Sequence, residues 1–197
     1  MTDAVLPARV AVYCGSRMGH DERFQHAARA LGATLADLGV GMVYGGASVG
    51  LMGVVATAAL DRGGEVIGVL PEGLRHREHR HPGLTDMRMV GSMHERKALM
   101  TELADAVVAL PGGIGTLDEL AEALAWHSLG ITRSPVGLLE VGGFWAPLVS
   151  LLDGFVATGF MSQERRDALC FDEDAERLVR ALGSGAGLTD DGVWRAG

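Results

Sequence analysis

Lysine is nearly absent from this sequence, and positive charge as a whole is scarce. Lys97 is the only lysine among 197 residues, and the net charge is −8. An acidic chain offers no general basic field that would attract a polyanion. We therefore expect no nucleic-acid partner, and we expect any small anionic ligand to be held locally by loops and a few arginines.

Cysteine is also scarce, and long apolar runs are missing. Cys14 and Cys170 are far apart and form no CxxC pair, which favours reduced thiols over a disulfide or metal ligands. No stretch approaches the roughly 20 apolar residues of a membrane-spanning helix. The N-terminus has no basic flank followed by an apolar run, so we expect no secretory signal, no membrane partner and a cytoplasmic location.

Three histidines lie close together in the polar segment RHREHRHP, at His76, His79 and His81. They could bind a metal, or the segment could be a solvated loop between strands. No carboxylate or cysteine surrounds them at a recognisable metal spacing, so we favour the loop and predict no metal site.

Short apolar runs alternate with longer amphipathic segments along the chain. Strands are expected over Arg9–Cys14, Val40–Tyr44, Glu65–Leu70, Asp86–Val90, Ala106–Leu110 and Pro135–Leu139. Helices are expected over Glu22–Leu38, Val49–Leu60, Met93–Leu103, Leu117–Ser128, Ala146–Ala157 and Ala175–Leu182. This alternation, with strands that are apolar on both faces, predicts an α/β fold with a parallel sheet covered by helices on each side. We expect one domain, with a core over about residues 8–182 and a glycine-rich tail over residues 183–197.

Three glycine-bearing turns follow three of these strands, with the sequences CGSR at 14–17, GGASVG at 45–50 and PGGIGT at 111–116. In such folds ligands bind outside the carboxyl ends of the strands. Glycine lets the main chain approach a ligand closely, and the helix that follows each turn offers unpaired N–H groups and partial positive charge. These features predict a phosphate site, although the glycines could also serve only to permit tight turns.

Neither common nucleotide fingerprint is present in these turns. A Walker A motif needs Gly-Lys-Ser/Thr, and the turn after the first strand is not GxGxxG. A mononucleotide or a phosphosugar is therefore favoured over a dinucleotide.

Two charged residues near the third turn have more than one interpretation. Thr116 and Glu119 have the spacing of a helix capping box, as do Ser92 and Glu95. If Glu119 instead belongs to the ligand site, it should face a neutral part of the ligand, such as a sugar hydroxyl. Arg96, near the start of its predicted helix, is either a surface arginine or part of the same site.

These motifs together resemble the LONELY GUY (LOG) family of cytokinin riboside 5′-monophosphate phosphoribohydrolases. The segment PGGIGTLDE at 111–119 matches the PGGxGTxxE motif, and MHERK at 93–97 matches the Met-x-x-Arg-Lys helix start. The segment YGGASVGLMG at 44–53 matches YGGGxxGLMG with Ala47 replacing a glycine, and CGS at 14–16 matches the opening turn. The likeness covers about residues 8–180.

The resemblance implies a Rossmann-like, doubly wound homodimer that needs no cofactor. It implies cleavage of the N-glycosidic bond of AMP or an N6-substituted AMP, giving the free base and ribose 5-phosphate. Arg96 and Glu119 match the catalytic pair of the family. Met52 and Met93 could offer apolar surface to the base or could belong to the core. The expected substrate-binding residues are Ser16, Gly45, Gly46, Gly50, Met52, Met93, Lys97, Gly112, Gly113, Gly115 and Thr116.

Two alternative functions fit these motifs less well. The family is often labelled lysine decarboxylase, but pyridoxal phosphate needs a Schiff-base lysine, and the single lysine lies within the Arg-Lys motif. A protein that binds or carries a nucleotide or a pterin cofactor without hydrolysis would also suit the glycine turns. Arg96 and Glu119 favour the enzyme, because a carrier needs the phosphate site but not that pair.

Overall fold

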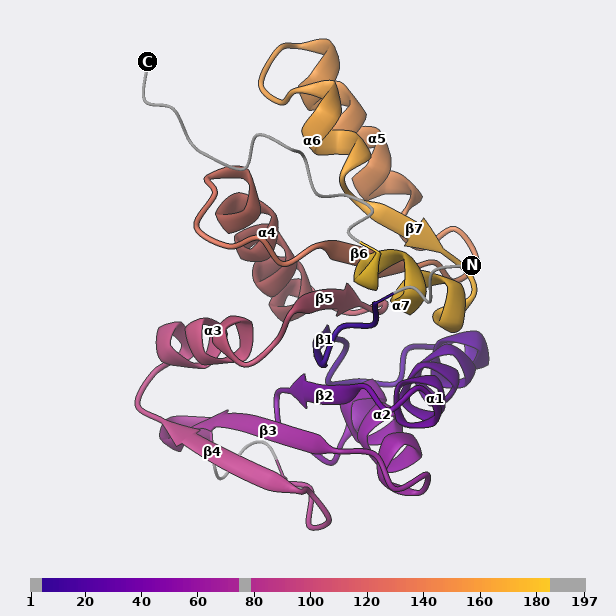
Figure 1. The fold of residues 1–197 in the computed structure, drawn as a ribbon, viewed down its shortest axis with the longest axis vertical. Helices are drawn as coiled ribbons and strands as arrows, with labels where there is room; N and C mark the ends of the chain where they lie inside the picture. Colours follow the sequence, from indigo (N-terminus) through magenta and orange to yellow (C-terminus); the bar gives the residue numbers. More distant parts are fainter. Residues whose placement is uncertain (1–4, 75–78, 185–197) are drawn as a thin grey trace.

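The computed structural model describes residues 5–74 and 79–184, and these form a seven-stranded, fully parallel sheet in the order β4-β3-β2-β1-β5-β6-β7 (Figure 1). The predicted parallel sheet is confirmed. The strands are β1 Arg9–Tyr13, β2 Gly41–Tyr44, β3 Val66–Pro71, β4 Asp86–Val90, β5 Ala106–Ala109, β6 Val136–Leu139 and β7 Cys170–Asp172.

Helices cover both faces of the sheet, as expected (Figure 1). Buried side chains of α1, α2 and α7 form one core layer, and those of α3, α4 and α5 form the other. The central strands are therefore buried on both sides, which explains why they read as continuous apolar runs. The helices are α1 Glu22–Asp37, α2 Gly50–Leu60, α3 Met93–Glu102, α4 Ile114–Ser128, α5 Ala146–Ala157, α6 Gln163–Asp167 and α7 Ala175–Gly183, with a 3-10 turn η1 at Glu72–Leu74.

The sequence patterns missed the 3-10 turn η1 and two further short elements. The edge strand β7 has three half-buried residues, and α6 has five residues without a buried face. Segments this short carry too few apolar positions to show a period. The predicted tail lies almost wholly outside the described residues. In the described part of the chain, no helix has both the length and the apolar character needed to cross a bilayer.

The chain order places the three glycine turns together. From β1 the chain runs outward through β2, β3 and β4, and it then returns to β5 on the other side of β1. This reversal creates a topological switch point between β1 and β5, where α/β sheets bind ligands. Gly15 N donates to Pro111 O over 3.1 Å, and this bond joins the turns that follow these two strands.

Candidate active site

A cavity of about 490 Å³ opens at this switch point, within the size range of small-molecule sites. Residues from all three turns and from the start of α3 line it. Both members of the predicted catalytic pair are among them. The predicted residues in the lining are Ser16, Gly45, Met52, Met93, Arg96, Gly112, Gly113, Gly115, Thr116 and Glu119.

The start of α4 presents open backbone amides to this cavity. Gly113 is the N-cap and has no side-chain cap, and the first helical hydrogen bond runs from Leu117 N to Gly113 O over 3.0 Å. The N–H groups of residues 114–116 therefore have no acceptor within the helix, and they carry the positive end of its dipole. A Cβ built on Gly113 or Gly115 would meet no atom within 4 Å, so a ligand can approach both.

The capping-box interpretation of Glu119 is wrong. The helix starts at Ile114, so Thr116 is its third residue and Glu119 its sixth. A side chain in the second turn cannot cap the first N–H groups. For Ser92 the N-cap itself is confirmed, because its hydroxyl accepts from Glu95 N over 3.1 Å. The return bond differs from a capping box, because the Glu95 carboxylate accepts over 2.9 Å from Gly91 N, one residue before the cap.

Arg96 and Glu119 form an ion pair at the wall of the cavity. Arg96 Nη2 lies 3.7 Å from Glu119 Oε1, and the two side chains are only 5% and 11% exposed. The surface-arginine interpretation of Arg96 is therefore wrong. Screening is weak at such depth, so each charge acts strongly on its partner and on a bound ligand.

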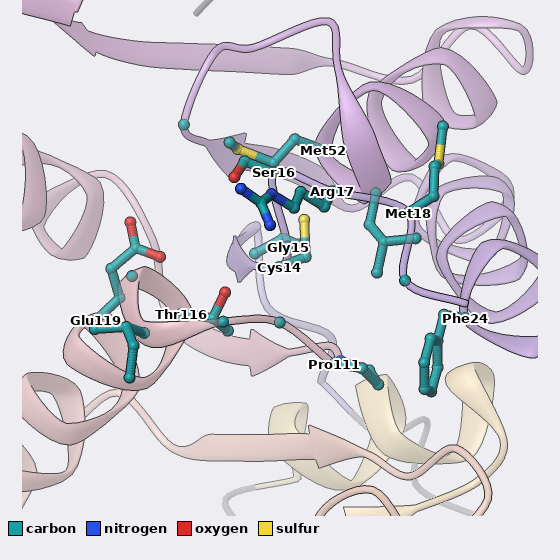
Figure 2. Close-up of a pocket in the computed structure, with 18 of the residues that line it drawn as sticks. Cys14, Gly15, Ser16, Arg17, Met18, Phe24, Met52, Pro111, Thr116 and Glu119 are labelled. Carbon is teal, nitrogen blue, oxygen red and sulfur yellow. The ribbon is translucent and has the colours of Figure 1, made fainter. Parts of the chain in front are cut away.

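Two glycines make room for polar side chains of the site. A Cβ on Gly45 would overlap Arg96 Nη2, and a Cβ on Gly112 would overlap Thr116 Oγ1. The Thr116 hydroxyl points into the cavity (Figure 2). Gly45 and Gly112 must therefore be glycine, because a side chain at either position would overlap a neighbouring polar group. Gly113 and Gly115 instead leave open space in which a ligand can bind.

The second turn differs from the predicted phosphate site. Gly50 has a φ of +61°, and a Cβ there would overlap the carbonyl group of Ser16. The first amides of α2 already face Gly15 O, at 3.0 Å from Leu51 N and 3.4 Å from Met52 N. The expectation that the GGASVG turn offers open amides is thus wrong, because the Gly15 carbonyl of the CGSR turn already accepts from these amides. Neither Gly46 nor Gly50 is in the cavity lining, and both support the tight-turn interpretation.

Lys97, predicted to bind substrate, also lies outside the cavity lining. Its Nζ is 3.0 Å from Asp118 Oδ2 and 3.1 Å from Glu122 Oε2. Burial by itself would lower the pKa of Lys97, but its hydrogen bonds to these carboxylates outweigh burial and raise the pKa. The lysine is therefore a charged bridge between α3 and α4.

The two methionines divide between core and surface. Met52 is buried and packs in the core while its edge lines the cavity, and Met93 is exposed at the rim. Met52 therefore fits both of the interpretations that the sequence left open. Met93 fits only the ligand-facing one.

Arg17 is a lining residue that the sequence analysis did not single out. Figure 2 shows Ser16 and Arg17 across the cavity from Thr116 and Glu119. In the part of the chain that the structure describes, no carboxylate pairs with Arg17. The sequence did hold a signal for Arg17. It directly follows the CGS turn, and that turn faces the predicted ligand site.

Aromatic and apolar side chains close the other end of the cavity. Met18 and Phe24 lie there beside Pro111 (Figure 2), and Phe144 packs edge-on against Phe24 with ring centroids 5.7 Å apart. Phe144 comes from the loop after β6, and no local motif connects that loop to the site. Only the parallel pairing of β6 with β5 brings it to this edge.

No feature of the described residues points to thiol or metal chemistry. Cys14 lies at the cavity floor, and burial raises the pKa of its thiol, which keeps it protonated. No disulfide joins it to Cys170. Within residues 5–74 and 79–184, no three His, Cys, Asp or Glu side chains are grouped to hold a metal. His76 lies outside the described residues, and His81 Nε2 is 3.1 Å from Thr57 Oγ1.

Comparison with known proteins identifies relatives along nearly the whole chain. A family model described as "Possible lysine decarboxylase" matches residues 52–182. The chain is 47% identical over 174 residues to the cytokinin riboside 5′-monophosphate phosphoribohydrolase LOG of Oryza sativa subsp. japonica, covering 88% of this chain and 72% of that protein. It is 41% identical over 179 residues to the cytokinin riboside 5′-monophosphate phosphoribohydrolase of Rhodococcoides fascians, covering 90% of each.

A solved structure shares the fold at lower identity. The molybdenum cofactor binding protein from Rippkaea orientalis superposes with a TM-score of 0.67 and 22% identity, covering 89% of this chain and 95% of that chain. At this identity the likeness concerns the fold alone. A shared fold therefore does not distinguish hydrolysis from cofactor binding, and the decision lies with the residues of the site.

Proposed function

This chain belongs to the family of cytokinin riboside 5′-monophosphate phosphoribohydrolases, and on that premise we propose that it hydrolyses the N-glycosidic bond of AMP or an N6-substituted AMP. The products are the free base and ribose 5-phosphate. A decarboxylase function would need a free lysine for a Schiff base, whereas Lys97 is held between two carboxylates.

The observation that carries this proposal is the buried Arg96–Glu119 pair next to the open amides of α4. In the proposed complex, the 5′-phosphate is held by the backbone N–H groups of Gly115 and Thr116 and by the Thr116 hydroxyl. The helix dipole favours a dianion at this point. Because Glu119 lies one turn further along α4, it faces the ribose and not the phosphate.

Glycosidic cleavage develops positive charge on the sugar, by analogy with other glycosidases. As the bond between C1′ and N9 breaks, a water oxygen bonds to C1′, and one proton of that water passes to the leaving base. The Glu119 carboxylate stabilises the cationic sugar and orients the water. Arg96 holds that carboxylate in place and offers hydrogen bonds to the sugar or the base. Ser16, Met52 and Met93 complete the walls around the nucleoside.

Substitution of Glu119 by Gln tests this function directly. Release of adenine and isopentenyladenine from their nucleoside monophosphates is followed by chromatography. We expect kcat to fall by about 10²- to 10³-fold, the range for a group that stabilises transition-state charge. The control is Glu176→Gln, the same chemical change at an exposed position on α7. Equal turnover by the two variants would contradict the proposal.

The alternative is a carrier that binds a nucleotide or a pterin cofactor without hydrolysis, and the fold is compatible with it. The wild-type protein separates the two functions. Release of free base from AMP within an hour at micromolar protein supports the enzyme. Tight binding of AMP without release supports the carrier, for which the buried ion pair has no evident use.

We also propose that the protein acts as a homodimer. The helix α4 buries Leu120 and Ala123 but leaves Ile114 and Leu117 exposed, and its C-cap residue Leu129 is exposed as well. Three large apolar side chains on the outer side of one helix are typical of a surface that another chain covers. An identical subunit would cover this face through a two-fold interface.

A further inference from the structure

An ionic cluster joins α3 to α4 immediately beside the Arg96–Glu119 pair. Lys97 Nζ contacts Asp118 Oδ2 at 3.0 Å and Glu122 Oε2 at 3.1 Å. The side chains of Lys97 and Glu122 are only 11% and 18% exposed, whereas Asp118 is largely exposed. The contact with Glu122 is therefore the one that solvent screens least.

The cluster and the proposed catalytic pair share a common geometry. Lys97 directly follows Arg96 on α3, and Asp118 and Glu122 stand on either side of Glu119 in the sequence of α4. Residues four apart lie on one side of a helix, so a single lysine can reach both carboxylates. Any shift of α3 against α4 that separated Arg96 from Glu119 would also stretch the Lys97 bonds.

We propose that Lys97 is a positioning residue, which clamps α3 to α4 and thereby sets the distance between Arg96 and Glu119. This inference rests on the proposed hydrolase function. It replaces the earlier expectation that Lys97 binds substrate, since its ammonium group is engaged by two carboxylates outside the cavity. The clamp acts on the rate of the chemical step, because a misplacement of about 1 Å in a catalytic group can cost about 10²-fold in rate.

The variant must remove the clamp without leaving a buried charge alone. Lys97→Met by itself strands the half-buried Glu122, which is strongly destabilising. The test variant is therefore Lys97→Met with Glu122→Gln, and its melting temperature is measured beside its activity. The matched control is Arg180→Met with Glu176→Gln, which removes an ion pair on the surface of α7. The conservative variant is Lys97→Arg.

For the folded double variant we expect kcat to fall by about 10- to 100-fold, with KM within about threefold of wild type. The α7 control should leave kcat unchanged, and Lys97→Arg should retain most of it. If the double variant keeps the wild-type kcat, or if its KM rises while kcat holds, the positioning role is excluded. The second outcome would return Lys97 to substrate binding.

The same substitutions made in the Arg96→Gln variant distinguish positioning from general stabilisation. Where Arg96 is already replaced by Gln, removal of the clamp should cost no additional kcat, because no guanidinium remains to be placed. If removal of the clamp lowers kcat by the same factor with Arg96 present and with Arg96 replaced, the inference is overturned. Such a result would show that the clamp acts independently of Arg96.

The clamp can also be tested if the proposed function itself fails. If wild-type protein releases no base from any nucleoside monophosphate, the hydrolase proposal is lost. Crystal structures of wild type and the double variant then decide the geometric claim alone. We expect the distance from Arg96 Nη2 to Glu119 Oε1 to lengthen in the variant, and an unchanged distance would refute the clamp.

Discussion

At the scale of single residues, the glycines of one motif have different reasons for being glycine. Gly112 makes room for the Thr116 side chain, whereas Gly113 and Gly115 leave open space at the end of α4. A sequence motif cannot show this difference, because the letter is the same. Substitution by alanine can separate the two reasons, since the added methyl group meets protein in one case and ligand in the other.

We expect Gly115→Ala to weaken substrate binding without weakening the fold. Its Cβ meets no protein atom within 4 Å, and alanine is favoured over glycine in a helix by up to about 1 kcal/mol. The melting temperature should hold or rise, while KM for AMP rises. The control is Gly154→Ala in α5, where the Cβ also meets no atom within 4 Å, and where KM should not change. A falling melting temperature with an unaltered KM would contradict the open-site interpretation.

Arg17 should contribute to recognition of the phosphate group. It is the lining arginine across the cavity from Thr116, and Arg96 is already paired with Glu119. For Arg17→Ala we expect KM for AMP to rise by about three- to tenfold with kcat nearly unchanged, as for loss of an exposed charged contact of about 1 kcal/mol. Arg29→Ala, at an exposed position on α1, is the control. An equal KM for both variants would exclude the phosphate contact.

At the scale of elements, the start of α4 shows how tertiary contacts override local preference. Glycine disfavours helix, and Thr116 with Glu119 has capping-box spacing, so local rules place the start near Leu117. The structure begins the helix at Ile114. The carbonyl oxygen of Pro111, just before the helix, accepts a hydrogen bond from Gly15 N. This contact with a turn distant in sequence constrains the chain as it enters the helix.

The last turn of α4 should make stability depend on pH. The pKa of His127 is lowered mainly by burial, and the positive charge of Arg165 lowers it further. In unfolded protein the pKa of histidine is about 6.5, so between the two values the unfolded state binds more protons and the free energy of unfolding rises with pH. This stability should be lost as pH falls below about 6.5.

Thermal unfolding between pH 5 and pH 7.5 measures this effect. We expect the melting temperature to increase with pH, and we expect His127→Gln to have a smaller increase than wild type. Because His81 also has a pKa lowered by burial, its replacement should remove a further part of the slope. An identical slope in wild type and in His127→Gln would refute the assignment.

At the scale of the whole molecule, the exposed apolar side of α4 predicts the oligomeric state. The chain has a mass of 20.7 kDa, and light scattering after size exclusion should report about twice that value for a homodimer. Leu129→Glu should yield monomer, because it places charge on the proposed interface. Phe160→Glu, which replaces an exposed aromatic residue in the turn between α5 and α6, should leave the dimer intact. A monomeric wild-type protein would contradict the proposal.

The sequence by itself determined the class of fold and the edge of the sheet that carries the site. Alternating apolar strands and amphipathic helices are local patterns, and glycine after a strand is a local signal, so both can be read from neighbouring residues. Tertiary structure alone decided which groups meet. Arg96 approaches Glu119, Lys97 bridges two carboxylates, and Phe144 reaches the cavity because strands distant in sequence pair side by side. Such contacts depend on the order of strands in the sheet, and no local pattern encodes a distance between helices.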